Sequence, residues 1–293
     1  MSIYSIRDLE QLSGIKAHTL RIWEQRYNIV SPKRTESNIR YYDEIALKLV
    51  LNISLLKDNG FKISRIAEMN DDEIKQEVIN ITNKSCKSSE QVQALTLAMV
   101  DFDEERFEKI IGTNTLQLGF ERTMTQVIYP FLTKIGFLWQ AGAVHPAQEH
   151  FMTNLIRQKI MVAIDGQISK AKSNASIFLL FLPEGELHEI SLLFAYYLAK
   201  SRGHKVIYLG QSLPLQDVFE VGKIHQPNFI VTIATSNPNQ DEIEGYLLQL
   251  ATKFPEAKLL LSGHQIIGQD LKLPENAILI HKINDLILLI NDL

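Results

Sequence analysis

The sequence predicts a multidomain protein in which a small head of short helices and a hairpin precedes a helical bundle and an α/β doubly wound parallel sheet. The head is indicated by helical apolar spacing that breaks at Ser13-Gly14, and the bundle by a middle segment without strand alternation. The sheet is indicated by short apolar runs that alternate with helical patterns. We place the head at 1–71, a polar linker at 72–90, the bundle at 91–172 and the sheet domain at 173–293.

Composition supports a folded protein of this kind. The chain has 293 residues, 45% of them hydrophobic and 22% charged, a mix typical of globular proteins. The single cysteine, Cys86, cannot form an internal disulfide, and the charged N-terminus lacks the apolar core of a signal peptide. Because no run approaches the roughly 20 apolar residues of a membrane span, we expect a cytoplasmic protein without a membrane role.

The head contains two helices, a hairpin and two further helices. Apolar residues at helical spacing stand on both sides of the turn: Tyr4, Ile6, Leu9 and Leu12 before it, then Ala17, Leu20, Trp23 and Tyr27. After Pro32, basic and β-prone residues flank a polar turn, which predicts a basic hairpin over 33–41. Helical spacing resumes over 43–59 and 63–69. This order indicates a helix-turn-helix followed by a wing.

These residues together resemble the winged-helix DNA-binding domain of MerR-type transcription regulators. The resemblance is carried by Tyr4-Ser5-Ile6, Gly14-Ile15, Thr19-Leu20-Arg21, Trp23-Glu24, Arg26-Tyr27, Pro32, Arg34, Asn38 and Arg40-Tyr41. It implies a double-stranded DNA operator as partner, with the second helix in the major groove. The candidate DNA contacts are Lys16, His18, Thr19 and Arg21 on that helix and Arg34, Asn38, Arg40 and Tyr41 on the wing. We expect Trp23 and Tyr27 to pack in the core instead.

Charge is distributed in the way that this assignment requires. Residues 1–70 contain eleven lysines and arginines against eight acids, which gives +3, whereas the whole chain carries −4 and the remainder therefore −7. A cationic head on an acidic body is typical of a DNA-binding module attached to a part with another task.

The last segment shows five short runs rich in Ile, Val and Leu, at 177–182, 205–209, 229–233, 258–261 and 277–280. Strands that are apolar along their whole length are buried on both faces, as in a doubly wound parallel sheet of the flavodoxin-like type. Ligands of such sheets bind at the carboxyl ends of the strands.

The loop after the first of these strands reads Pro183-Glu184-Gly185-Glu186-Leu187-His188-Glu189-Ile190-Ser191. It resembles the cobalamin-binding fold of methionine synthase and mutases, whose loop carries Asp-x-His-x-x-Gly. The resemblance implies that His188 is the lower axial cobalt ligand and that Glu186 hydrogen-bonds the other ring nitrogen. Glu186 replaces the family's Asp, as in its photoreceptor branch, and Ser191 replaces the Gly. Small and hydroxyl residues at later strand ends, where that family lines the channel for the nucleotide tail, are Thr235, Ser236, Ser262 and Gly263.

A second motif lies in the bundle, where Trp139 is followed after nine residues by Glu149-His150. This spacing resembles the upper-face motif of the CarH/LitR-type light-responsive repressors. The resemblance implies that Trp139 covers the adenosyl group of adenosylcobalamin and that Glu149 contacts its ribose. His150 would be the upper axial cobalt ligand after photolysis. Pro146 predicts the first turn of the helix that carries this pair.

Five other histidines lack the paired spacing of a zinc site, and we expect them at the surface or in loops. They are His145, His204, His225, His264 and His281.

The expectation from the sequence is a transcription regulator and not an enzyme: a repressor that binds cobalamin and responds to light. The resemblance implies a homo-oligomer, a dimer that becomes a tetramer in the dark. Two alternatives stay open. One is a MerR-like regulator whose sensor domain takes another ligand or a protein partner, and the other is a cobalamin-dependent enzyme component.

Overall fold

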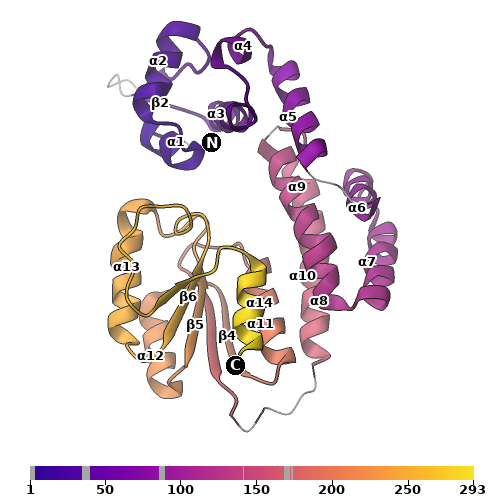
Figure 1. Cartoon of the computed structure of the whole chain (residues 1–293), viewed down its shortest axis with the longest axis vertical. Helices are drawn as coiled ribbons and strands as arrows, with labels where there is room; N and C mark the ends of the chain where they lie inside the picture. Colours follow the sequence, from indigo (N-terminus) through magenta and orange to yellow (C-terminus); the bar gives the residue numbers. More distant parts are fainter. Residues whose placement is uncertain (1–3, 35–39, 86–89, 141, 168–171, 173) are drawn as a thin grey trace. The chain divides into compact units, whose positions relative to one another are not determined.

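The computed structural model describes residues 4–34, 40–85, 90–140, 142–167, 172 and 174–293. The chain divides into two compact units, Met1–Met152 and Thr153–Leu293. Each unit is described by itself below, with the labels of Figure 1.

The head has the predicted order of elements. They are α1 (Ile6–Ser13), α2 (Ala17–Tyr27), β1 (Lys33–Arg34), β2 (Arg40–Tyr41), α3 (Glu44–Asp58) and α4 (Ile63–Ala67). Helix α1 begins with a capping box between Ser5 and Asp8 and ends at Gly14, whose φ of 70° is the left-handed conformation that glycine adopts without strain. The helix-turn-helix predicted from the break at Ser13-Gly14 is confirmed.

The core of the head is built from side chains of α1, α2, α3 and α4. Trp23 is buried and Tyr27 packs against the same cluster, as expected for apolar positions on the inner face of α2. The cluster also contains Ile74 and Val78 of α5 (Asp71–Ser85). The stretch expected as a linker at 72–90 therefore contains a helix whose apolar side chains are part of the head core, because its polar composition conceals an apolar stripe.

The middle of the chain is helical, as predicted. It contains α6 (Glu90–Asp101), α7 (Glu104–Leu118), α8 (Phe120–Thr123), the π-helical turn η1 (Met124–Ile128), α9 (Tyr129–Gln140) and α10 (Pro146–Asp165). Helix α10 begins at Pro146, as expected. Helix α9 packs against α6 and η1 and also against α3 and α5 of the head. Among the described residues, no helix is both long and apolar enough to cross a membrane.

The second unit contains a five-stranded parallel sheet with helices on both faces (Figure 1). The strands are β3 (Ile177–Pro183), β4 (Lys205–Leu213), β5 (Phe229–Ile233), β6 (Lys258–Ser262) and β7 (Ala277–Leu279). The helices are α11 (Ile190–Ser201), α12 (Leu215–His225), α13 (Gln240–Lys253) and α14 (Ile283–Asn291). All five predicted strands and the doubly wound fold are confirmed.

The strand order is β4-β3-β5-β6-β7. Strand β3 has parallel neighbours on both sides, β4 and β5, and the order of the strands reverses at this point. The loops that leave the carboxyl ends of β3 and β5 therefore flank the switch point, where doubly wound sheets bind ligands.

Candidate functional site

The candidate site lies at this switch point, where the β3–α11 loop meets the β5–α13 loop. Its centre is Glu186, whose side chain is completely buried. The Glu186 Oε2 atom accepts three backbone N–H groups of the β5–α13 loop, from Thr235 at 2.8 Å, Ser236 at 2.6 Å and Asn237 at 3.2 Å. One carboxylate oxygen thus ties together two loops that are about fifty residues apart in the sequence.

The other oxygen of Glu186 binds the segment that carries His188. Glu186 Oε1 accepts the backbone N–H groups of Leu187 at 2.9 Å and His188 at 3.1 Å. It also lies 2.5 Å from Nδ1 of the His188 ring. The predicted contact between Glu186 and the imidazole is therefore present.

These hydrogen bonds determine the charge of the pair. Burial alone would raise the pKa of Glu186, and it is the largest single influence. The His188 side chain and the backbone N–H groups of Ser236, His188 and Asn237 together outweigh it and lower the pKa to about 2. At neutral pH Glu186 is therefore a carboxylate, and the His188 Nδ1 atom carries the proton between them. Since 63% of the His188 side chain is exposed, the ring is presented to solvent at the carboxyl ends of the strands.

Further polar contacts that the sequence did not indicate hold the same loops in place. The Ser212 hydroxyl accepts the backbone N–H of Gly185 at 3.0 Å, and the Asn237 side chain donates to the Gly185 carbonyl at 3.0 Å. Gln211 donates to the Leu187 carbonyl at 2.6 Å. These residues come from the β3–α11 loop, the end of strand β4 and the β5–α13 loop, so no local motif links them.

The remaining residues predicted for this site lie at the expected strand ends. Thr235 and Ser236 contribute backbone N–H groups to Glu186, and the Ser262 hydroxyl donates to the Ile280 carbonyl at 2.8 Å. Gly263 has φ of 103°, and a Cβ atom there would lie 2.2 Å from the Ala234 carbonyl oxygen. A glycine at this position lets β6 pass close to the end of β5. Ser191 stands in the first turn of α11.

Two features of the site fit a corrin with a nucleotide tail. The His188 donor set is that of a metal-binding imidazole, with one nitrogen on a carboxylate and the ring edge exposed. Two hydroxyls, those of Thr232 in β5 and Tyr246 in α13, are buried and face each other, and neither has another hydrogen-bond partner. Such a pair has donor and acceptor capacity left for a ligand or water, so these residues fit a polar group entering beside β5.

A second buried acid, Glu189, lies next to His188 and was missed by the sequence analysis. Its two oxygens bind Arg157 of α10 and the Tyr208 hydroxyl, the latter at 2.9 Å. Burial and the Glu189 charge raise the pKa of Tyr208. The loop that carries His188 is thus joined through Glu189 to the second half of α10, within the same unit.

The upper-face motif belongs to the first unit. Trp139 lies in the last turn of α9 and is half-buried, with Nζ of Lys48 lying 4.9 Å from its ring centroid. Glu149 and His150 lie in the first turns of α10, where Nδ1 of His150 is 3.5 Å from a Glu149 oxygen. The His150 side chain is 72% exposed. The two residues are thus placed on one helix end, as predicted; their roles toward a cofactor stay predictions.

The candidate DNA contacts of α2 are at its exposed N-terminal end. His18 and Arg21 are exposed, Thr19 is partly exposed, and the side chain of Lys16 is 79% exposed. Lys16 pairs with Glu10 at 3.3 Å, a surface ion pair of low energy that a nucleic acid can replace.

Glu10 has a second function in the head. It caps α2 by accepting the Ala17 N–H at 3.0 Å, and this bond is the main reason why the pKa of Glu10 is lowered. This carboxylate fixes the start of the helix that is expected to enter the groove.

Arg34 of β1 and Arg40 of β2 stand directly opposite each other in the antiparallel ladder of the wing, and both are exposed. Nε of Arg40 lies 3.7 Å from a Glu24 oxygen of α2, a surface ion pair that ties the wing to this helix. Tyr41 is paired with Lys33 in the same ladder. Asn38 lies outside the described residues.

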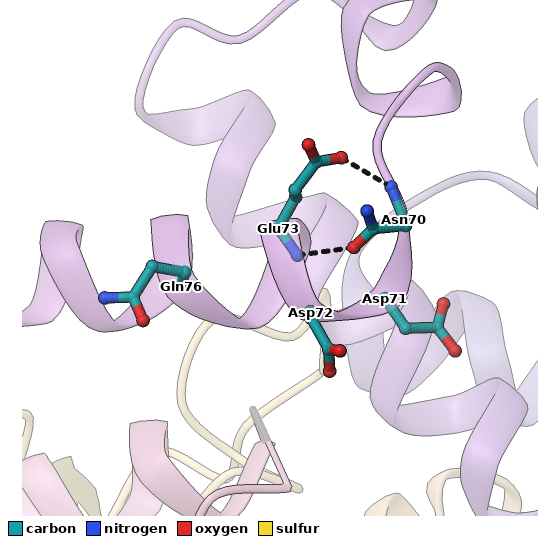
Figure 2. Close-up of a pocket in the computed structure, with 5 residues that line it drawn as sticks. All are labelled: Asn70, Asp71, Asp72, Glu73 and Gln76. Carbon is teal, nitrogen blue, oxygen red and sulfur yellow. Dashed lines mark hydrogen bonds between the residues drawn. The ribbon is translucent and has the colours of Figure 1, made fainter.

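Figure 2 shows a hollow lined by Asn70, Asp71, Asp72, Glu73 and Gln76 at the start of α5. Asn70 and Glu73 accept each other's backbone N–H groups at 2.9 and 2.8 Å, so these residues form a helix cap.

His204 lies in a loop, one of the two placements expected for these histidines, but it is buried. Its Nδ1 accepts the Ser176 N–H at 3.3 Å and its ring is 5.4 Å from that of Phe178. It lies just before β4, where the chain enters the sheet. Among the described residues, no cluster of histidine, cysteine and acidic side chains could hold a metal ion.

Comparisons with known proteins agree with this arrangement. Residues 4–73 match the MerR HTH family regulatory protein, and residues 91–163 match the B12 binding domain. The HTH-type transcriptional repressor CarH of Myxococcus xanthus is 23% identical over 258 residues, which cover 86% of this chain and 85% of the relative. The repressor CarA of the same organism is 26% identical over 211 residues, covering 71% and 68% of the two chains.

Among solved structures, the monomethylamine corrinoid protein of Methanosarcina barkeri aligns with a TM-score of 0.53 at 13% identity. The alignment covers 75% of this chain and all of that protein, and it shows a shared fold. Residues 4–73 thus match a MerR-type helix-turn-helix domain and residues 91–163 a B12 binding domain, and the chain is similar to the repressor CarH over most of both lengths.

Proposed function

We propose that this chain is a DNA-binding transcription regulator, not an enzyme, whose DNA affinity is controlled by cobalamin. The observation that carries the proposal is the pair of Glu186 and His188 at the switch point of the sheet, in a chain that begins with a MerR-type head. A buried carboxylate that orients an exposed imidazole is a metal-ligand arrangement.

In this proposal Nε2 of His188 would bind the cobalt, because Nδ1 is held by Glu186. The carboxylate keeps the ring in one tautomer and makes its outer nitrogen a better donor. The hydroxyls of Thr232 and Tyr246 would bind a polar part of the nucleotide tail beside β5.

The finer part of the proposal is that the cofactor is adenosylcobalamin and that the signal is light. The similarity to CarH and the Trp139, Glu149 and His150 motif support it. When bound, adenosylcobalamin would supply a cobalt–carbon bond that light cleaves. Trp139 would shield the upper face, Glu149 would bind the ribose, and the exposed His150 would be available to bind cobalt once that face is open.

On DNA, the chain acts as a repressor in the cytoplasm, and several heads in one oligomer raise its affinity for the operator through avidity. A dimer matches two half-sites about one helical turn apart, and a tetramer in the dark would double the number of heads. The exposed Arg34 and Arg40 of the wing would bind phosphates.

The cofactor experiment is an absorption spectrum of the full chain after mixing with adenosylcobalamin in the dark and desalting, repeated after green illumination. We expect a corrin spectrum that is retained and then shifts. His188→Ala should weaken retention, His150→Ala should alter only the illuminated spectrum, and His225→Ala, an exposed histidine on α12, should change neither. Loss of all cofactor from the unmodified chain on desalting would refute cobalamin control and favour another ligand.

The DNA experiment selects duplexes from a random pool with the loaded protein and measures affinity at several salt concentrations. Arg34→Ala and Arg40→Ala should each weaken binding and reduce the salt slope by about one. Lys253→Ala on α13, a lysine far from the head in sequence, is the control. An unchanged salt slope in both wing variants would contradict the assignment of the wing to DNA.

A further inference from the structure

A lysine of the DNA-binding head contacts the tryptophan that is expected to cover the cofactor. The ammonium nitrogen of Lys48, on α3, lies 4.9 Å from the centroid of the Trp139 ring, on α9. This distance is typical of a cation–π interaction. Both residues belong to the first unit, in which α9 packs directly against α3 and α5. The head is thus attached to the bundle at the end of α9.

A hollow of about 280 Å³ lies beside this contact, between α3, α5 and Gly142, which comes after α9. Its lining mixes apolar and charged side chains: Ile45, Lys48, Leu49, Asn52, Asp71, Ile74 and Lys75. Asn52 is only 4% exposed, yet its side-chain oxygen has no hydrogen-bond partner.

The hollow and Asn52 belong to the α3–α5 side of this contact. The head is held on α9 by the Lys48–Trp139 contact and by the packing of α9 on α3 and α5. A cation–π contact at a partly exposed site is weak, so a ligand that takes up the Trp139 ring can displace it.

We propose that Lys48 and the cofactor compete for Trp139, so that cofactor binding releases the head from α9. The inference rests on the proposed function, in which the Trp139 ring shields the upper cofactor face. By linkage, the head and the cofactor then weaken each other's hold on Trp139 by the same factor. Lys48 lies on α3, the helix that follows the wing. Loss of its contact with Trp139 therefore gives the DNA-binding head more freedom to move relative to α9.

The test compares adenosylcobalamin affinity in the dark for the full chain and for Lys48→Ala, measured by absorption titration. Removal of a competing contact should tighten binding about two- to fivefold, the factor that corresponds to an exposed cation–π contact. Hydroxocobalamin, which lacks the adenosyl group, should show no such difference. Unchanged or weaker adenosylcobalamin binding by Lys48→Ala would overturn the inference.

The chain offers a matched control on the same helix. Nζ of Lys57 lies 4.9 Å from the ring of Trp23, the same distance as in the Lys48 pair, but both of these residues belong to the head. Lys57→Ala therefore removes an equivalent contact without touching α9, and it should leave cofactor affinity unchanged. If both variants changed cofactor affinity equally, the cause would be destabilisation of the head, and the inference would be refuted.

A second readout needs no cofactor. Amide hydrogen exchange at residues 136–140, the end of α9, should become about two- to fivefold faster in Lys48→Ala and stay unchanged in Lys57→Ala. Equal rates in all three proteins would refute the docking contact itself. If the unmodified chain retains no cobalamin, the proposed function fails on that result, while the exchange rates still decide whether Lys48 holds the head on α9.

Discussion

Replacement of Glu186 by glutamine is the most informative single change in the sheet domain. The carboxylate accepts three N–H donors at Oε2 and three at Oε1, counting Nδ1 of His188. The amide of glutamine has one oxygen and one NH₂ group, so three donors lose their acceptor and face another donor instead. If the amide rotates by 180°, its NH₂ group faces the other three donors, so three hydrogen bonds are lost in either orientation.

The magnitude follows from the pKa. The pKa of Glu186 falls from 4.5 to about 2 on folding, although burial, its largest influence, acts in the opposite direction. One pKa unit corresponds to about 1.4 kcal/mol, so the fold stabilises the charged form by about 3 kcal/mol relative to the neutral form. The side chain is completely buried, and solvent screening does not reduce this value. We expect Glu186→Gln to lower the free energy of unfolding of the second unit by about 3 kcal/mol.

The assay is urea unfolding of the full chain at pH 7, with amide exchange of residues 177–262 to follow the second unit separately. Glu184→Gln is the matched control, because Glu184 is an exposed glutamate in the same loop. A loss below about 1 kcal/mol for Glu186→Gln would refute the view that this carboxylate holds the two loops together. A similar loss in Glu184→Gln would refute its attribution to the buried hydrogen bonds.

The same pKa predicts a pH dependence. Because the pKa is lower in the folded state, Glu186 stabilises the fold fully above its unfolded value of about 4.5. This contribution is lost as the pH falls from about 4.5 towards 2. The free energy of unfolding of the unmodified chain should therefore fall by about 3 kcal/mol more than that of Glu186→Gln between pH 4.5 and pH 2.

Two further predictions concern a glycine and a histidine of the same unit. Gly263→Ala should cost about 1–3 kcal/mol more than Gly268→Ala in urea unfolding, since both have positive φ but only the first would place Cβ 2.2 Å from the Ala234 carbonyl oxygen. Equal costs would show that the close approach relaxes easily. Burial, with a smaller contribution from a nearby lysine charge, lowers the pKa of His204 from 6.5, so stability should fall as the pH drops below about 6.5. His204→Gln should reduce that loss and His225→Gln, at an exposed position, should not; identical pH profiles for all three chains would contradict a neutral buried His204.

Local patterns in the sequence were sufficient for the elements and for the fold class. Glycine at 14 ends α1, Pro146 begins α10, and continuous apolar runs mark the five strands. These signals are local, because they depend on backbone conformation and on burial along one element. They fail where polar composition conceals an apolar stripe, as in α5, whose Ile74 and Val78 complete the head core.

The candidate site was predicted in part for the same reason. His188 and Glu186 are two residues apart in one loop, and their contact is a local one that the resemblance indicated. The three N–H groups that hold Glu186 from the β5–α13 loop and the link from Glu189 to Arg157 join distant segments.

The sequence by itself therefore determined the kind of protein: a MerR-type head, a helical bundle and a doubly wound sheet with an imidazole at the end of its first strand. The tertiary structure alone decided which distant groups meet. It placed the β5 loop on Glu186, buried His204, and brought Lys48 of the head onto Trp139 of the bundle. Such contacts depend on how strands and helices pack in space, and no periodicity along the chain records that packing.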